Sequence, residues 1–211
     1  MAKFRISYNA PVVLTFALLA VAVFIIGSQV SSFRLWFVAW PEFRDTRSYV
    51  GLVSHILGHA SWEHLLGNFM LILLIGPILE ERFGSLQLLI MILVTALVTG
   101  VVNVAVSNDA LLGASGIVFM MILLASTANI REGEIPLTFI AVAVIYLGGE
   151  IVRAVSKDDQ ISQMAHLLGG ATGAVFGFMS ARRKGAKKIA ATKATDVLAP
   201  KAAAKRAPLG P

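Results

Sequence analysis

Long apolar stretches separated by short polar segments run along the chain as far as Ser180. A helix rises about 1.5 Å per residue, so about 20 mostly apolar residues are needed to cross the hydrocarbon core of a membrane. Six stretches reach or approach this length: Pro11–Gly27, Trp62–Leu79, Leu86–Val106, Gly113–Asn129, Ile135–Gly149 and Ile161–Met179. The fourth and fifth are short, which is tolerated where neighbouring helices enclose a helix in protein. The pattern predicts an all-α, polytopic membrane protein with a six-transmembrane-helix bundle.

The first apolar stretch follows Lys3 and Arg5, an arrangement that also occurs in secretory signal peptides. The apolar core of a signal peptide is about 7–15 residues long and precedes a small-residue cleavage site. This stretch is longer and is followed by Ser28-Gln29-Val30, so we interpret it as a retained span.

Aromatic and basic residues are interleaved between the first two predicted spans. Aromatic rings in such positions settle at the headgroup level of a membrane. The segment contains Phe33, Arg34, Trp36, Phe37, Trp40, Phe43 and Arg44. We expect a short interfacial helix here, and Pro41 is expected to end it.

Composition supports a membrane protein. Of the 211 residues, 57% are hydrophobic and 14% are charged, whereas a soluble domain carries about 25% charged residues. The absence of cysteine excludes disulfides, thiolate metal ligands and a cysteine nucleophile.

The net charge of +6 is concentrated at the carboxyl end, where residues 182–211 carry nine Lys or Arg and a single acid, Asp196. The Ala, Lys and Pro content of this segment predicts a disordered basic tail after a membrane domain that spans residues 1–181. Basic residues also accumulate on the cytoplasmic side of membrane proteins. Placing the amino terminus inside puts 13 of the 18 basic residues there. We therefore expect both termini in the cytoplasm and the protein in the plasma (inner) membrane.

Several polar residues occur inside the predicted spans, where their cost usually indicates function. In this topology the second, fourth and sixth spans all run from outside to inside. His64 and Asn68 lie in the first two turns of the second span, Ser115 in the first turn of the fourth, and His166 early in the sixth. All four are expected at a similar depth in the outer part of the membrane, which predicts one shared site.

This set of residues can perform serine-type hydrolysis. Ser115 is a candidate nucleophile and His166 a candidate base for its proton. His64 and Asn68, four residues apart on one helix face, can donate hydrogen bonds to an oxyanion, as can backbone N–H groups at the start of the fourth helix. Small residues are expected to allow close approach of backbones at the site: Gly113, Gly116, Gly169 and Gly173.

Three motifs resemble those of the rhomboid intramembrane proteases. They are His59-x4-His64-x3-Asn68, Gly113-Ala114-Ser115-Gly116 and Ala165-His166-x2-Gly169-x3-Gly173. The resemblance covers residues 55–173 and includes Glu80, Glu81, Arg82 and Gly84, which resemble the turn after the family's second helix. We expect these residues to cap the inner end of that helix, with Gly84 as its terminator.

The resemblance implies a six-helix bundle around a water-filled cavity that opens to the outside. It implies a catalytic dyad of Ser115 and His166, and an oxyanion hole formed by His64, Asn68 and the Ser115 amide. His59 and His55 are expected to give structural support. The substrates would be single-span transmembrane proteins, cut in the lipid bilayer near its outer surface, without a metal or other cofactor and without a nucleic-acid partner.

Two positions depart from the family pattern. The Trp-Arg pair that often precedes the motif histidines is replaced by Val50 and Gly51, which puts the anchoring of this loop in question. The Tyr that often follows the serine by four residues is Phe119, which retains a ring for stacking on His166 but has no hydroxyl.

Other interpretations remain open at this level. Taken alone, Ser115 resembles a helix cap, and His55, His59 and His64 could bind a metal or haem. A Ser–Lys dyad would have to use Lys157, which lies in an outer loop. A rhomboid-like binding or chaperone protein without catalysis is the main alternative, although such a relative is expected to lack Ser115 or His166.

Overall fold

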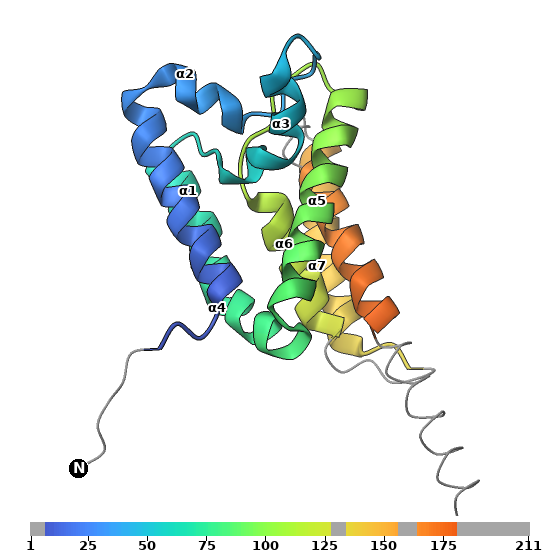
Figure 1. Cartoon of the computed structure of the whole chain (residues 1–211). Coiled ribbons are helices and arrows are strands. Elements are labelled where there is room, and N and C mark those ends of the chain that lie inside the picture. Colours follow the sequence, from blue (N-terminus) through green and yellow to red (C-terminus); the bar gives the residue numbers. More distant parts are fainter. Residues whose placement is uncertain (1–6, 128–133, 156–163, 181–211) are drawn as a thin grey trace, which may run out of the picture.

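The computed structural model describes residues 7–127, 134–155 and 164–180, and their regular secondary structure is helical, with an isolated β-bridge between Ala39 and Leu111 (Figure 1). The predicted tail at 182–211 lies outside the described residues, as do the end of the fourth predicted span and the start of the sixth. The helices are α1 (Pro11–Gln29), α2 (Ser31–Arg34), η1 (Leu35–Phe37), α3 (Thr46–Ser54), η2 (His55–Leu57), α4 (Trp62–Phe83), α5 (Ser85–Val106), α6 (Ser115–Ser126), α7 (Leu137–Val155) and a helix over residues 164–180.

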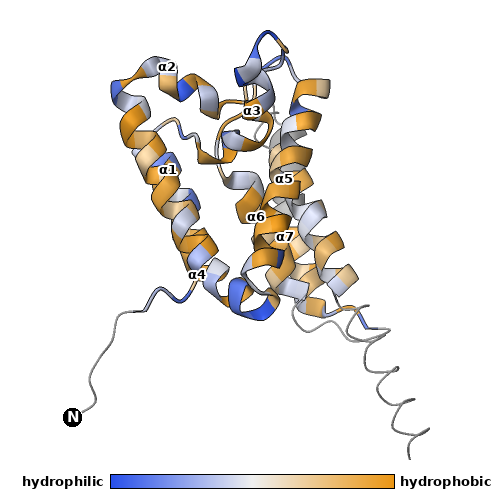
Figure 2. Ribbon diagram, in the orientation of Figure 1, coloured by the Kyte–Doolittle hydropathy of each residue, from blue (hydrophilic) through white to orange (hydrophobic). Residues whose placement is uncertain are grey.

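Three described helices are long and apolar enough to cross a membrane: α1, α4 and α5. Figure 2 shows mostly hydrophobic residues along α1 and α5. Apolar side chains of the three helices are exposed, and Leu18, Leu74 and Leu86 are each more than 60% exposed. Such surfaces are unfavourable in water and favourable against lipid tails. The prediction of an all-α membrane protein is confirmed at this level.

The short helix α6 occupies the centre of the described helices. It is only 12 residues long and is apolar on all sides, which is typical of a helix that is buried all round. It packs against α4, α5 and α7. Its buried residues are Gly116, Ile117, Val118, Met120, Met121, Ile122, Leu123 and Leu124. Because protein encloses it, its backbone need not reach both membrane surfaces.

The connection between α1 and α4 contains more structure than the sequence indicated. The interfacial helix is present as α2 and η1, but it ends at Phe37, before Pro41. A further helix, α3, follows it and was not predicted. Asp45 caps α3 by accepting a hydrogen bond from the Ser48 amide at 3.3 Å. A hydrogen bond from Arg47 lowers the pKa of the exposed Asp45 carboxylate and so favours the charged form, a stronger acceptor.

The position of Glu80 corrects one prediction. Its carboxylate does not cap its own helix but lies at the start of α1, where it accepts hydrogen bonds from the amides of Val12 (2.9 Å) and Val13 (3.0 Å). Ser85 donates a third bond at 2.7 Å. A carboxylate at a helix amino terminus satisfies free N–H groups and interacts favourably with the helix dipole. Gly84 ends α4 as expected, with φ 84° and its amide bonded to the Glu80 carbonyl.

We predict that Glu80→Ala destabilises the protein by about 2–4 kcal/mol, because it leaves buried N–H groups of α1 without an acceptor. Glu80→Gln, which keeps one acceptor oxygen, is expected to cost less. Thermal unfolding of the purified protein in detergent measures both effects. Glu81→Gln is the matched control, since Glu81 is the exposed neighbour. Equal melting temperatures for Glu80→Ala and the control would contradict the assigned role.

Candidate active site

The amino-terminal end of α4 presents two of the predicted site residues. Ser61 caps this helix by accepting a hydrogen bond from the His64 amide at 3.2 Å. This cap sets the start of the helix, so that His64 lies in its first turn and Asn68 one turn later on the same face. The Asn68 side chain is buried, with 7% of its surface exposed, whereas His64 is half-buried.

The turn before α6 lies directly against these two side chains. A Cβ atom on Gly113 would be 2.7 Å from Nε2 of His64 and 3.9 Å from Nδ2 of Asn68, so the turn touches the imidazole. Gly113 has φ 123°, a conformation that favours glycine. Its amide donates to the His55 carbonyl at 2.9 Å, and the Ala39–Leu111 bridge holds the preceding residues. Glycine is therefore required at position 113, because φ is positive there and because the His64 ring leaves no space for a side chain.

Ser115 is the first residue of α6 and is half-buried. The preceding residue, Ala114, is the N-cap, and its methyl side chain cannot make a capping hydrogen bond. Because the first N–H groups of a helix have no partner within it, they can donate to an oxyanion that forms beside Ser115.

Glycines bring the 164–180 helix into backbone contact with α6. A Cβ atom at Gly169 would lie 2.0 Å from the carbonyl oxygen of Gly116, and one at Gly173 would lie 2.2 Å from that of Met120. No side chain fits at either position. Small residues at four-residue spacing allow this close approach in membrane proteins. The contact begins beside Ser115 and continues for more than one turn of α6.

His166 lies against the same face of α6 that carries Ser115. Its imidazole stacks on the ring of Phe119, with ring centroids 4.3 Å apart and planes inclined by 7°. Phe119 is one helical turn after Ser115, so the two share a face. The structure thus brings together residues from α4, α6 and the 164–180 helix, while their catalytic roles stay predictions.

The two other histidines hold the surrounding backbone. His55 is 1% exposed, and its Nδ1 lies 3.1 Å from the Gly51 carbonyl. Because a carbonyl only accepts, Nδ1 carries the proton. Nε2 lies 3.3 Å from the Thr99 hydroxyl, which donates to the Thr95 carbonyl at 2.9 Å. By the same argument Nδ1 of His59 donates to the Leu57 carbonyl at 3.2 Å. His59 also packs edge-on against His64, with ring centroids 5.0 Å apart.

Two buried polar atoms beside the turn have no hydrogen-bond partner within the described part of the chain. They are Nε2 of His59 and Nδ2 of Asn68. With its proton on Nδ1, the His59 ring offers Nε2 as an acceptor, whereas Nδ2 of Asn68 is a donor. An unpaired buried polar atom of either kind is costly, so both are expected to bind a ligand, water or reaction intermediate. The Asn68 amide lies close to the Gly113 turn and is therefore positioned to donate to a group bound there.

Sequence analysis missed a polar row on α5. Thr95, Thr99 and Asn103 occur at four-residue spacing and are all buried. Thr95 bonds Thr172 of the 164–180 helix at 3.1 Å, and Asn103 donates to the Asp109 carbonyl at 3.0 Å. The sequence could have revealed this row, because polar residues at i, i+4 and i+8 in an apolar span lie on one helix face that is expected to point into the protein.

The packing of the loop explains how Val50 and Gly51 can replace the Trp-Arg pair of the family motif. Gly51 lies under the backbone of Val38, and a Cβ atom there would be 2.1 Å from the Val38 carbonyl oxygen. Val50 is 42% exposed. The loop is therefore anchored by close backbone packing at the place of the Trp-Arg pair.

Among the described residues no group of three or more His, Cys, Asp or Glu could hold a metal ion.

Comparison with known proteins identifies relatives of the chain. The chain is 26% identical over 176 residues to Rhomboid protease GlpG of Haemophilus influenzae, which covers 80% of the chain and 91% of that protein. It is 34% identical over 143 residues to Rhomboid-related protein 1 of Caenorhabditis elegans, covering 60% of the chain and 38% of the relative. Rhomboid protease GlpG of Yersinia enterocolitica is 27% identical over 184 residues, with 83% and 65% covered. The family model described as Rhomboid domain matches residues 46–183, and the chain therefore belongs to the rhomboid family of integral membrane proteins.

Proposed function

We propose that this protein is an intramembrane serine endopeptidase in which Ser115 is the nucleophile and His166 the general base. The observation that carries the proposal is the stacking of His166 on Phe119, one turn from Ser115, where glycines join the two helices. Stacking fixes the plane of the imidazole, and helix contact fixes its distance from α6. A serine hydroxyl needs such a positioned base to become nucleophilic.

In this mechanism Oγ of Ser115 attacks the scissile carbonyl carbon while His166 accepts the hydroxyl proton. The resulting tetrahedral intermediate collapses as His166 returns the proton to the leaving amine, which gives an acyl-enzyme and frees the new amino terminus. Water then attacks the ester carbonyl while His166 accepts one of its protons. The second tetrahedral intermediate collapses with cleavage of the bond between the carbonyl carbon and Oγ, and His166 returns the proton to Oγ of Ser115, which releases the carboxylic acid product and restores the dyad. The Phe119 ring stacked on His166 supports the plane of the imidazole during these transfers.

The oxyanion would be held by His64, Asn68 and the Ser115 amide. The contact of the Gly113 turn with His64, and the unpaired Nδ2 atom of Asn68, support this assignment. Donors fixed before the reaction stabilise the developing charge without reorganisation. His59 and His55 act as structural support for this end of α4 and for the turn.

We infer that the substrates are single-span transmembrane proteins, cut near the outer membrane surface. Relatives named as rhomboid proteases support this class of activity.

The proposed topology has six spans in the plasma membrane, with both termini in the cytoplasm. It rests on the bias of basic residues together with α1, α4 and α5 as spanning helices.

The alternative is a rhomboid-like protein that binds transmembrane segments without cutting them. Such a protein would not need a serine at the start of a helix, where N–H groups can bind an oxyanion, or a histidine held near that serine by stacking. The chain has both features, and the endopeptidase is therefore favoured.

We predict that Ser115→Ala and His166→Ala each lower cleavage of a transmembrane substrate by at least about a thousandfold, because the nucleophile or its base is lost. Labelling the purified protein with a fluorophosphonate, followed by peptide mapping, should modify Ser115 in the wild type. Ser126→Ala, on the same helix, is the matched control and should cleave normally. Wild-type cleavage by Ser115→Ala would remove this residue from the mechanism.

Asn68→Ala should lower kcat by about 10- to 100-fold with little change in KM, because one of several oxyanion donors is removed. Steady-state kinetics with a transmembrane substrate separate the two parameters. A rise in KM at constant kcat would instead assign Asn68 to substrate binding.

Phe119→Tyr should retain activity, because the ring stacked on His166 is kept. Phe119→Leu should lower kcat by about 3- to 10-fold, the loss expected from one ring contact worth about 0.5–1.5 kcal/mol. The comparison of the two variants in one cleavage assay tests the positioning role, and equal rates would contradict it.

A further inference from the structure

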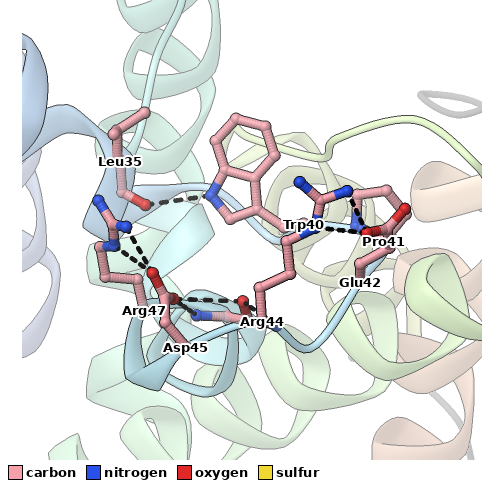
Figure 3. A pocket seen from close by; sticks show the side chains of 8 residues that line it. Leu35, Trp40, Pro41, Glu42, Arg44, Asp45 and Arg47 are labelled. Atoms are coloured by element: carbon pink, nitrogen blue, oxygen red, sulfur yellow. Dashed lines mark hydrogen bonds and ion pairs between the residues drawn. The ribbon is translucent and has the colours of Figure 1, made fainter.

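A polar pocket of about 390 Å³ lies in the connection between α1 and α4, formed by residues between η1 and the start of α3 (Figure 3). Small-molecule sites commonly have volumes of about 300–1,000 Å³, so the pocket is large enough for a headgroup-sized ligand. None of its lining residues belongs to the candidate active site. The side chains used below are Trp40, Glu42, Arg44, Asp45 and Arg47.

The pocket carries two positive and two negative side chains, arranged as two ion pairs. Nε of Arg44 donates to Glu42 at 2.5 Å, and Nε of Arg47 donates to Asp45 at 2.7 Å. The first pair is 78% and 61% exposed, and the second 39% and 40%. Exposed ion pairs contribute little to stability, so a charged ligand can take the place of one partner at small cost.

The ring of Trp40 stands between the two ion pairs (Figure 3). Its Nε1 donates to the Leu35 carbonyl at 3.3 Å, which holds the ring as a wall of the pocket. The ring also offers an apolar surface, and its face can attract a cation. A ligand in this pocket would therefore meet a flat aromatic surface with charges of both signs beside it.

Exposed aromatic residues indicate that the pocket lies at the membrane surface. Phe43 and Tyr49 stack with ring centroids 4.9 Å apart and are 50% and 62% exposed. Trp36, before the pocket, is 40% exposed. Aromatic side chains gather at the headgroup level of membranes, where one edge is wet and the other apolar. The ligands most abundant at this level are phospholipid headgroups.

We propose that this pocket binds the headgroup of a zwitterionic phospholipid that carries a primary amine. Arg44 and Arg47 would bind the phosphate, and Glu42 and Asp45 would accept hydrogen bonds from the ammonium. The four side chains sum to zero charge, which matches a zwitterion. A purely anionic headgroup would face two uncompensated carboxylates, and a choline group has no N–H to donate to them.

The test uses the full-length protein, extracted from membranes that contain equal amounts of ethanolamine, choline and glycerol phospholipids. Native mass spectrometry then measures the lipids retained by the protein. We expect enrichment of ethanolamine phospholipid in the wild type, and a loss of at least about fivefold in Arg44→Gln/Arg47→Gln. Arg34→Gln is the matched control, because Arg34 lies in the same connection but outside the pocket. It should retain the wild-type amount.

A second double variant, Glu42→Gln/Asp45→Asn, separates recognition of the amine from recognition of the phosphate. Asn at position 45 keeps the ability to cap α3. The preference should shift from ethanolamine to anionic glycerol phospholipid. Ser115→Ala should retain lipid as the wild type does, so the result does not depend on catalysis.

Equal lipid retention by Arg44→Gln/Arg47→Gln and the Arg34→Gln control would overturn the proposal, as would the absence of ethanolamine enrichment in the wild type. Reduced substrate cleavage by the arginine variant with unchanged lipid retention would assign the pocket to a peptide segment instead, and would equally overturn it.

Discussion

The candidate site depends on backbone contact between α6 and the 164–180 helix. Lipid tails are as apolar as leucine side chains, so helices in a membrane gain little from apolar burial alone and associate through close packing. Gly169 and Gly173 permit that packing by leaving their carbonyl neighbours on α6 unobstructed. A methyl group at either position would force the helices apart. His166, placed just before this contact, would then lose its position beside α6, whatever the chemistry of its ring.

Backbone groups at helix ends and in turns are bonded by polar groups from other elements or from neighbouring turns. Unsatisfied N–H and C=O groups cost several kcal/mol in hydrocarbon, so each must find a partner within the protein. The Glu80 carboxylate accepts hydrogen bonds from amides in the first turn of α1, and the His55 carbonyl accepts one from the Gly113 amide. The Asn103 side-chain amide donates to the Asp109 carbonyl. These contacts explain why costly polar groups occur at the ends of apolar helices.

Apolar patterning located the long helices well, because their length and composition are local properties. The third predicted span, Leu86–Val106, differs from α5 (Ser85–Val106) by one residue. The motif residues were likewise visible, since His64, Asn68, Ser115 and His166 stand out in apolar surroundings. What could not be predicted depends on distant contacts. The partner of Glu80 lies 68 residues away. Helix α3 is short, and its position follows from Gly51 meeting Val38 and Gly100 meeting Leu52.

The same short helix, α3, joins the polar pocket to the candidate active site. Asp45 and Arg47, at its amino end, belong to the pocket. His55 follows its last residue and holds the Gly113 turn through its carbonyl. Close backbone contacts at Gly51 and Gly100 fix the helix between these points, so it cannot shift independently of α5. Packed elements of this kind transmit displacement rather than absorb it. The placement of the proposed oxyanion donors is therefore expected to depend on the position of the connection between α1 and α4 at the membrane surface, as well as on the glycine contact between α6 and the 164–180 helix.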